Sequence, residues 1–362
     1  MGATTSRTQS PSIPRPRTDA AALQPLEGES LASWIQAVAR NRGVETSALF
    51  RDLRLYSDDA LSRAQTRLTA KTARRLSNET ETSEEVLHGM TLARYAGSAL
   101  PHMPPIPWTD GTVFKQWRTS AWFSDHRARW CTQCLRENDS RWLLQWLLPW
   151  SFACLKHRVF LAAECIRCLS PVYFGRHFAL DYCLAGGEAR LNPYGYAEAC
   201  DFWVRMHRPL PVTADSVIRH QERVNAWLDG YPSSNDREFV SLTAVLVMLV
   251  TPIMLQRRGE DPAILCGLRS GRRTGLIRER GMWADPLRVA AAASVADRLL
   301  QRYGASPIEV ARYIEGMRCV DWQPQYELDV MDWAYGSALR PNAYVEELVR
   351  LGVITICAST RK

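Results

Sequence analysis

Closely spaced pairs of metal-binding side chains in the middle of the sequence constrain its fold more than any other feature. Cys131 and Cys134 form one pair, and Cys154 and His157 form another pair 19 residues later. Two ligands separated by two residues meet one ion from a tight turn, so two such pairs complete the tetrahedron that zinc prefers. Three thiolates and one imidazole predict a closed, structural zinc site, which we call the first group.

A second group is indicated directly downstream. Cys165 and Cys168 repeat the paired spacing, and Cys183 follows them. The spacing does not fix the fourth ligand: Cys200 is the leading candidate and His177 is the next. The sequence therefore predicts one zinc ion and permits a second.

The distribution of cysteines favours metal binding over disulfide bonds. Six of the ten cysteines lie between Cys131 and Cys183, and the first residues show no charged-then-apolar signal segment. We therefore expect a cytoplasmic protein. The longest apolar run, residues 239–255, is short for a membrane span, so we expect a buried helix there and no membrane association.

No pattern typical of an enzyme accompanies these ligands. Four mainly sulfur ligands leave no open position of the kind that a catalytic zinc needs. The deaminase order of motifs is not met either, because His220 and Glu222 follow the cysteine pairs instead of preceding them. Walker, nucleophile-elbow and dinucleotide motifs are missing from the sequence. We therefore expect a protein that is not an enzyme.

Composition and periodicity divide the chain into four predicted segments, which together make a mostly α protein. Residues 1–25, rich in Pro, Ser and Thr, are predicted to be a disordered leader. Residues 26–105 are predicted to be helical and helix-turn-helix-like. Residues 106–190 are predicted to be an irregular zinc-finger region of the treble-clef or knuckle type. Residues 191–362 are predicted to be a C-terminal helical domain.

Helix signals are strongest near the N-terminus, where Ser30 is suited to cap a helix that Gly43 ends. The other predicted helices cover residues 46–53, 58–77, 83–90, 194–207, 214–228, 239–255, 286–302, 307–317 and 343–351. The Trp-rich run 141–150 is interpreted mainly as a small core around the metal pairs. A partner-binding or base-stacking surface is the alternative interpretation of that run.

The order of motifs over residues 25–186 resembles that of the TniQ/TnsD transposition proteins. The matching segments are Pro25 with Leu26-Glu27-Gly28-Glu29-Ser30-Leu31-Ala32-Ser33-Trp34, then Glu84 to Leu92, Trp130 to Cys134, Leu148-Pro149-Trp150, Cys154 to His157, and Leu161 to Cys168. One departure concerns the second finger, which the family usually ends in Cys-x-x-Cys, whereas Gly186 stands at that position here.

This resemblance implies a targeting protein of a transposon. Such a protein marks an integration site and recruits an AAA+ ATPase regulator, which in turn calls the transposase. Some members work with a CRISPR effector complex and its guide RNA, and others bind DNA themselves. The alternative is a zinc-stabilised helix-turn-helix DNA-binding regulator without a transposition role. A homodimer is compatible with either interpretation.

Cationic side chains in the predicted helix over residues 58–77 are the candidate nucleic-acid contacts. They recur at three-to-four spacing and so line one helical face. Such a stripe can follow a phosphate backbone, although a solvated face would have the same pattern. The following helix carries two glutamates and a histidine, so we expect weak or borrowed base specificity. The residues of the stripe are Arg63, Arg67, Lys71, Arg74 and Arg75.

Overall fold

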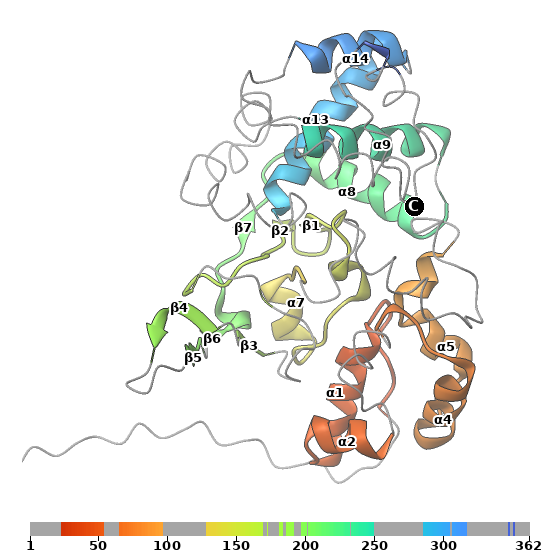
Figure 1. Ribbon diagram of the computed structural model, residues 1–362, viewed down its shortest axis with the longest axis vertical. Helices are drawn as coiled ribbons and strands as arrows, with labels where there is room; N and C mark the ends of the chain where they lie inside the picture. The colour runs from red at the N-terminus through yellow and green to blue at the C-terminus, as the bar shows by residue number, and fades with distance from the viewer. Residues whose placement is uncertain are drawn as a thin grey trace, which may run out of the picture.

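The structure is a computed structural model of the whole chain. It describes residues 23–53, 65–96, 128–168, 172, 181–183, 186–191, 197–200, 202–231, 233–249, 285–304, 306–316, 347 and 350–351. Most of the predicted leader and most of the predicted helix over residues 343–351 lie outside these ranges. Figure 1 shows helices at both ends of the molecule, with a region of short strands and turns between them.

Short helices form the N-terminal layer: α1 (Leu31–Arg42), α2 (Thr46–Asp52), α4 (Ala70–Thr80) and α5 (Glu84–Gly89), followed by the 3-10 turn η1 (Leu92–Tyr95). The predicted ends of α1 are confirmed. The Ser30 side chain accepts a hydrogen bond from the backbone N–H of Ser33, and Gly43 has the left-handed φ of 66° that favours glycine. Ser83 caps α5 in the same way.

These helices enclose a core of their own, which is distinct from the core of the rest of the protein. Its largest side chains are Trp34 and Phe50, each 1% exposed. Burial of such side chains contributes about 1.5–3 kcal/mol each, which compensates for the poor intrinsic stability of short helices. The apolar members are Leu31, Trp34, Ile35, Val38, Ala39, Leu49, Phe50, Leu53, Leu68, Ala73, Leu76, Leu87 and Met90.

The single helix predicted over residues 58–77 is wrong. Residues 67–69 are not helical, α4 begins only at Ala70, and residues 58–64 lie outside the described ranges. Thr69 explains the break, because its side-chain oxygen accepts a hydrogen bond from the N–H of Thr72 at 3.2 Å. A threonine in that role begins a helix and does not continue one.

The middle of the chain is irregular, as predicted, and contains the helix α7 (Thr132–Glu137) and the 3-10 turns η2 (Leu144–Leu147) and η3 (Val204–Met206). Its strands make three small antiparallel sheets. β1 (Ala153–Cys154), β2 (Val159–Phe160) and β7 (Leu210–Pro211) form one, β3 (Tyr182–Cys183) pairs with β6 (Phe202–Trp203), and β4 (Gly186–Leu191) pairs with β5 (Ala197–Ala199).

The predicted helix over residues 194–207 is wrong as well. The described part of this segment forms β5, β6 and η3. Helical spacing of apolar residues is overridden here by strand pairing, because Phe202 lies opposite Cys183 and Trp203 lies opposite Tyr182. Aromatic side chains fit such a half-buried strand surface well.

The C-terminal helices are α8 (Asp215–Leu228), α9 (Ser234–Leu249), α13 (Pro286–Tyr303) and α14 (Pro307–Glu315), close to their predicted positions. α13 packs against both α8 and α9 (Figure 1). A row of fully buried alanines, Ala290 to Ala293, provides the small side chains for this packing. Within the described ranges, no helix combines the length and apolar character that crossing a bilayer requires.

The Trp-rich run is a core, as its main interpretation predicted. Trp142, Trp146 and Trp150 are at most 2% exposed. The ring centroids of Trp142 and Trp146 lie 6.0 Å apart, and those of Trp150 and Trp227 lie 5.4 Å apart. Because Trp227 belongs to α8, the cysteine-rich middle and the C-terminal helices share one apolar core.

Candidate functional site: two metal groups and a basic helix

The structure brings the four side chains of the first group together. Cys131 directly precedes α7 and Cys134 lies in its first turn, while Cys154 ends β1 and His157 lies in the turn to β2. The Nδ1 atom of His157 lies 3.4 Å from the sulfur of Cys131 and 3.3 Å from that of Cys134. The sulfurs of Cys134 and Cys154 lie 3.6 Å apart.

These separations fit a tetrahedral metal site. Zinc–sulfur and zinc–nitrogen bonds of normal length place two sulfurs about 3.8 Å apart and a sulfur and a nitrogen about 3.5 Å apart. A disulfide bond would instead need about 2.05 Å between sulfurs. Hydrogen bonds from the thiols of Cys131 and Cys134 hold the pKa of Cys154 well below its usual range, while the pKa values of those two thiols are raised. The lowered pKa favours the thiolate form of Cys154, which is the form that binds a metal.

A carboxylate outside the group orients its histidine. The Oε1 atom of Glu137 lies 2.8 Å from Nε2 of His157, on the side of the ring that faces away from the sulfurs. The other oxygen of Glu137 accepts a hydrogen bond from the Lys156 ammonium at 2.6 Å. Histidine ligands of metals usually make such an outer contact, which fixes the ring and its tautomer.

The second group is also assembled, and Cys200 is its fourth member. Cys165 and Cys168 lie in one turn, and the pairing of β3 with β6 brings Cys183 and Cys200 to them. The sulfurs of Cys165 and Cys200 lie 3.7 Å apart, and those of Cys168 and Cys183 lie 3.6 Å apart. Within each group, all four ligand atoms lie within 4.8 Å of one another.

The departure from the family pattern at the second finger has a structural explanation. Gly186, at the position of the usual second cysteine, is the first residue of β4. The β4–β5 hairpin follows, and the chain then returns with Cys200 just before β6. An inserted hairpin thus replaces the two-residue spacing. His177, the other candidate ligand, lies outside the described residues.

The N-terminal family motif docks the helical layer onto the cysteine-rich middle. Glu29 is 1% exposed and forms a two-pronged ion pair with Arg141, whose Nε lies 2.8 Å from its Oε1. The hydroxyl of Ser33 donates to Glu29 at 2.8 Å and accepts from the N–H of Trp142 at 2.8 Å. The backbone N–H of Ser30 donates to the Trp142 carbonyl at 2.9 Å. The motif therefore holds two regions in one fixed arrangement.

A buried arginine holds the Leu148-Pro149-Trp150 motif. Arg129 is 4% exposed, and its guanidinium donates to the backbone carbonyls of Leu148, Pro149 and Ser151, the last at 2.7 Å. Burial lowers the pKa of Arg129 to about 9, so the side chain still carries its charge at neutral pH. Sequence reasoning missed Arg129, Glu29 and Arg141, because no local pattern marks a contact between distant segments.

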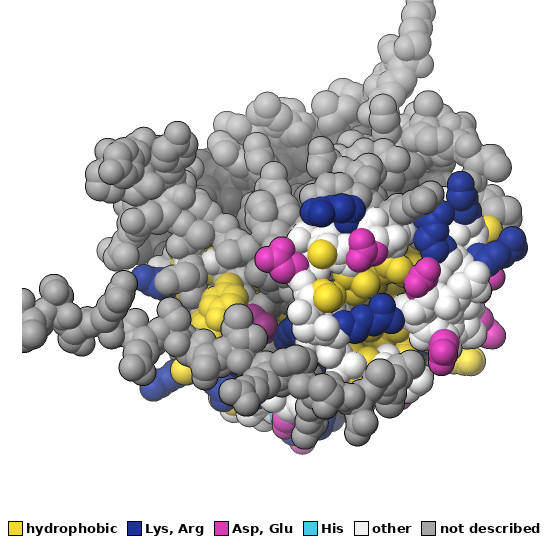
Figure 2. All heavy atoms as spheres, turned by 90° about the horizontal axis from the view of Figure 1, so that it is seen from below, with side chains coloured by type: hydrophobic (Ala, Val, Ile, Leu, Met, Phe, Trp, Pro, Cys, Tyr) yellow, Lys and Arg dark blue, Asp and Glu magenta, His cyan; other side chains and the backbone are white. Residues whose placement is uncertain are grey.

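The predicted cationic stripe is only partly present. Lys71, Arg74 and Arg75 lie on α4 and line a hollow of about 380 Å³, together with Ala70, Asn78 and Glu79. Figure 2 shows Lys and Arg side chains gathered at the edge of the molecule where α4 lies. The prediction that Arg67 shares their exposed face is wrong, because Arg67 precedes the helix and is only 7% exposed. Arg63 lies outside the described residues.

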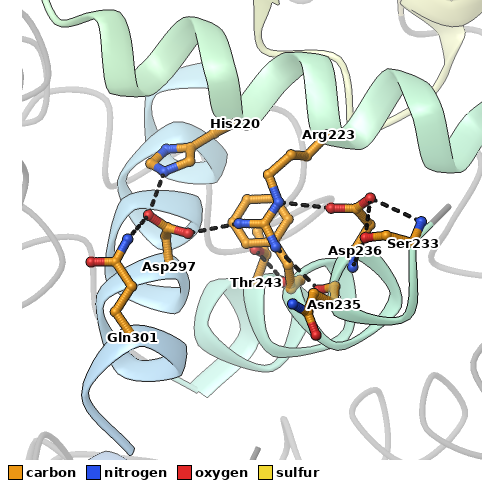
Figure 3. Close-up of polar contacts among 9 residues, drawn as sticks. His220, Arg223, Ser233, Asn235, Asp236, Thr243, Asp297 and Gln301 are labelled. Carbon is orange, nitrogen blue, oxygen red and sulfur yellow. Dashed lines mark hydrogen bonds and ion pairs between the residues drawn. The ribbon is translucent and has the colours of Figure 1, made fainter. Parts of the chain in front are cut away.

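A polar network joins the C-terminal helices (Figure 3). Arg223 of α8 donates to Asp236 of α9 at 2.8 Å and to Asp297 of α13 at 2.6 Å, and its guanidinium lies 3.9 Å from the centre of the Phe239 ring. The Nε2 atom of His220 lies 3.3 Å from Asp297. This contact and the charge of Arg223 hold the pKa of Asp297 below its usual range. The network fixes the three helices relative to one another.

These features define a class of protein, a mostly α scaffold in which helical layers are fixed to a middle region with two Cys/His groups that could hold metal ions. Residues 20–161 match the model of the TniQ family. The chain therefore contains a TniQ domain, which implies a transposition-associated protein. The match includes the N-terminal helices and the first group, and it ends before the second group. A search of curated proteins gave no match.

Proposed function

We propose that this protein is a non-catalytic targeting adaptor of a transposon. It marks the integration site and recruits an AAA+ ATPase regulator, which brings the transposase. The TniQ domain over residues 20–161 is the observation that carries this proposal. The buried bonds between the helical layer and the cysteine-rich middle support it, because an adaptor must hold its partners in one geometry. We expect it to act in the cytoplasm.

Both metal groups are proposed to bind zinc. Sulfur-rich tetrahedral sets select zinc over magnesium or calcium, which take oxygen ligands. Three sulfurs and a nitrogen in the first group, and four sulfurs in the second, close each site to substrate. Zinc would then fix α7 on the β1–β2 hairpin in the first group and the β3–β6 pair in the second.

Removing the carboxylate behind His157 is expected to weaken zinc binding. Glu137→Gln keeps the size of the side chain but loses its charge, so zinc affinity should fall by about 10–100-fold. Competition with a chromophoric zinc chelator measures this change. Asp139→Asn is the matched control, because Asp139 uses its backbone carbonyl, not its carboxylate, to accept a hydrogen bond from Arg40. Equal zinc affinities for both variants would contradict the assigned role of Glu137.

DNA is the proposed ligand of the α4 surface. Lys71 and Arg74 are exposed, and a run of cations beside a hollow suits a phosphate backbone. The first turn of α5 carries Glu84 and Glu85, whose charges repel phosphates. We therefore expect binding through the backbone with little reading of base sequence.

Charge reversal on α4 tests this contact. Lys71→Glu with Arg74→Glu removes two phosphate contacts, which should lower the salt slope of DNA binding by about 2. Between 50 and 200 mM salt the unmodified protein should then lose roughly tenfold more affinity than the variant. Fluorescence anisotropy with a labelled duplex measures both slopes. An unchanged slope would show that this face is only solvated.

The way in which the protein finds its target depends on whether it binds DNA itself or binds a CRISPR effector complex. Direct DNA binding and recruitment through a CRISPR effector complex with its guide RNA are both compatible with an adaptor. Adjacent genes for an AAA+ ATPase and a transposase would distinguish the adaptor from a DNA-binding regulator. The direct test is binding of the purified ATPase, assembled on DNA with nucleotide, to the immobilised protein. A complex supports the adaptor, whereas no binding under assembly conditions favours the regulator.

A further inference from the structure

We infer that DNA also contacts a second surface, formed by Arg136 and Arg205 beside Trp203 and by the exposed Arg208 three residues further along the chain, which we call the arginine surface. This inference rests on the proposed DNA binding of α4 and extends it to a second part of the chain. The observation behind it is that Arg136 and Arg205, which have no ion-pair partner among the described residues, lie beside the Trp203–Tyr182 aromatic pair.

The aromatic part of this surface is a fixed platform. Trp203 of β6 packs edge-on against Tyr182 of β3, with ring centroids 5.1 Å apart at an interplanar angle of 82°. The guanidinium of Arg205 lies over the Trp203 ring, 4.2 Å from its centre. A stacked guanidinium keeps its N–H edges available, and those edges match the geometry of a phosphate.

A second cation reaches the platform from another element. Arg136 lies in the last turn of α7, and its Nε donates to the backbone carbonyl of Arg205 at 2.9 Å. Because α7 carries Cys134 of the first group and Cys183 on β3 belongs to the second group, both groups hold parts of this surface in place.

The charge on this surface is not compensated within the described residues. Arg136, Arg205 and Arg208 have no ion-pair partner there. Two acidic side chains close in sequence to this surface are already engaged: Glu137 of α7 pairs with Lys156, and Asp181, which precedes β3, pairs with Arg40. Three cations left unpaired on a folded surface attract a polyanion.

Its position favours DNA over an acidic protein. Figure 2 views the molecule from below, from the side on which α4, β3 and β6 lie in Figure 1. Figure 1 places β3 and β6 toward the left of the molecule and α4 toward the right, and Figure 2 shows several separate Lys and Arg side chains on the face seen from below. One long, regularly charged ligand would meet both surfaces, as a DNA duplex does.

The test compares charge reversals on the two surfaces. Arg205→Glu with Arg208→Glu should lower the salt slope for a long duplex by about 2, as the α4 variant does. A variant with charge reversals on both α4 and the arginine surface should have a salt slope lower by about 4. On a duplex too short to reach both surfaces, the two reversals should no longer add. Arg205→Gln with Arg208→Gln, which should lower the slope similarly, keeps the test valid if the reversed chain fails to retain zinc.

Arg219→Glu with Arg237→Glu is the matched control, because both arginines are exposed and belong to α8 and α9, which lie above β3 and β6 in Figure 1. The control variant should bind DNA with the same salt slope as the unmodified protein. If the Arg205 and Arg208 variants keep the full salt slope of DNA binding while the α4 variant loses part of it, the DNA contact of the arginine surface is overturned and that of α4 is not. If none of the variants lowers the salt slope, the proposed DNA contact of α4 is overturned as well. Tighter binding of an RNA duplex, or of an acidic protein, through the same arginines would contradict the proposal that the arginine surface binds DNA.

Discussion

Replacing Cys134 with serine is expected to unfold the middle of the protein. Structural zinc contributes about 10–16 kcal/mol in finger peptides, which is as large as the net stability of a typical domain. Cys134 connects α7 to the β1–β2 hairpin, and the tryptophan core is built around these elements. Zinc content by elemental analysis, together with tryptophan fluorescence, measures the effect.

Two comparisons make this result specific. Cys357→Ser changes a cysteine that belongs to neither group and should leave zinc content and fluorescence unchanged. Cys200→Ser should remove one zinc ion and disturb the β3–β6 pair, while the core around the first group remains folded. A Cys134→Ser chain that stays folded with two zinc ions would contradict the assignment of the first group.

Breaking the ion pair between Glu29 and Arg141 is expected to cost about 3–5 kcal/mol of unfolding free energy. The two side chains are 0% and 10% exposed, so Glu29→Gln leaves a buried guanidinium without its charge partner. Ser33 and the backbone N–H of Leu26, at 3.0 Å, would also lose a charged acceptor. Urea unfolding at neutral pH measures the change.

An exposed pair is the matched control for this prediction. Arg312 donates to Glu309 at 3.1 Å, with side chains 61% and 49% exposed, so Glu309→Gln should cost less than about 1 kcal/mol. The double variant Glu29→Gln with Arg141→Leu should recover part of the loss, because no unpaired charge remains buried. Equal costs for the buried and the exposed single variants would show that the motif does not fix the two regions.

Local chemistry is what the sequence predicted well. The two-residue spacing predicts which side chains gather in the two Cys/His groups, and Cys200, the leading candidate for the fourth member of the second group, lies with them in the structure. Ser30 and Gly43 marked the ends of α1 because capping depends on the nearest few residues. The Trp-rich run predicts a core because large apolar rings next to closely spaced metal ligands require burial.

Contacts between distant segments could not be predicted in this way. Glu29 and Arg141 are 112 residues apart, and neither carries a pattern that indicates a partner. Residues 194–207 have helical spacing, but pairing of β6 with β3 decides their structure. Arg67 has the spacing of a surface stripe, yet the helix break at Thr69 removes it from that face.

Reconstituted transposition tests the targeting role most directly. The transposase, the AAA+ ATPase and donor DNA are combined with a target that carries the integration site, with and without this protein, and insertion positions are mapped by sequencing. The adaptor predicts insertions concentrated at one site only when the protein is present, and loss of that concentration with the Cys134→Ser chain, which lacks a ligand of the first group. The same number and distribution of insertions without the protein would contradict the account.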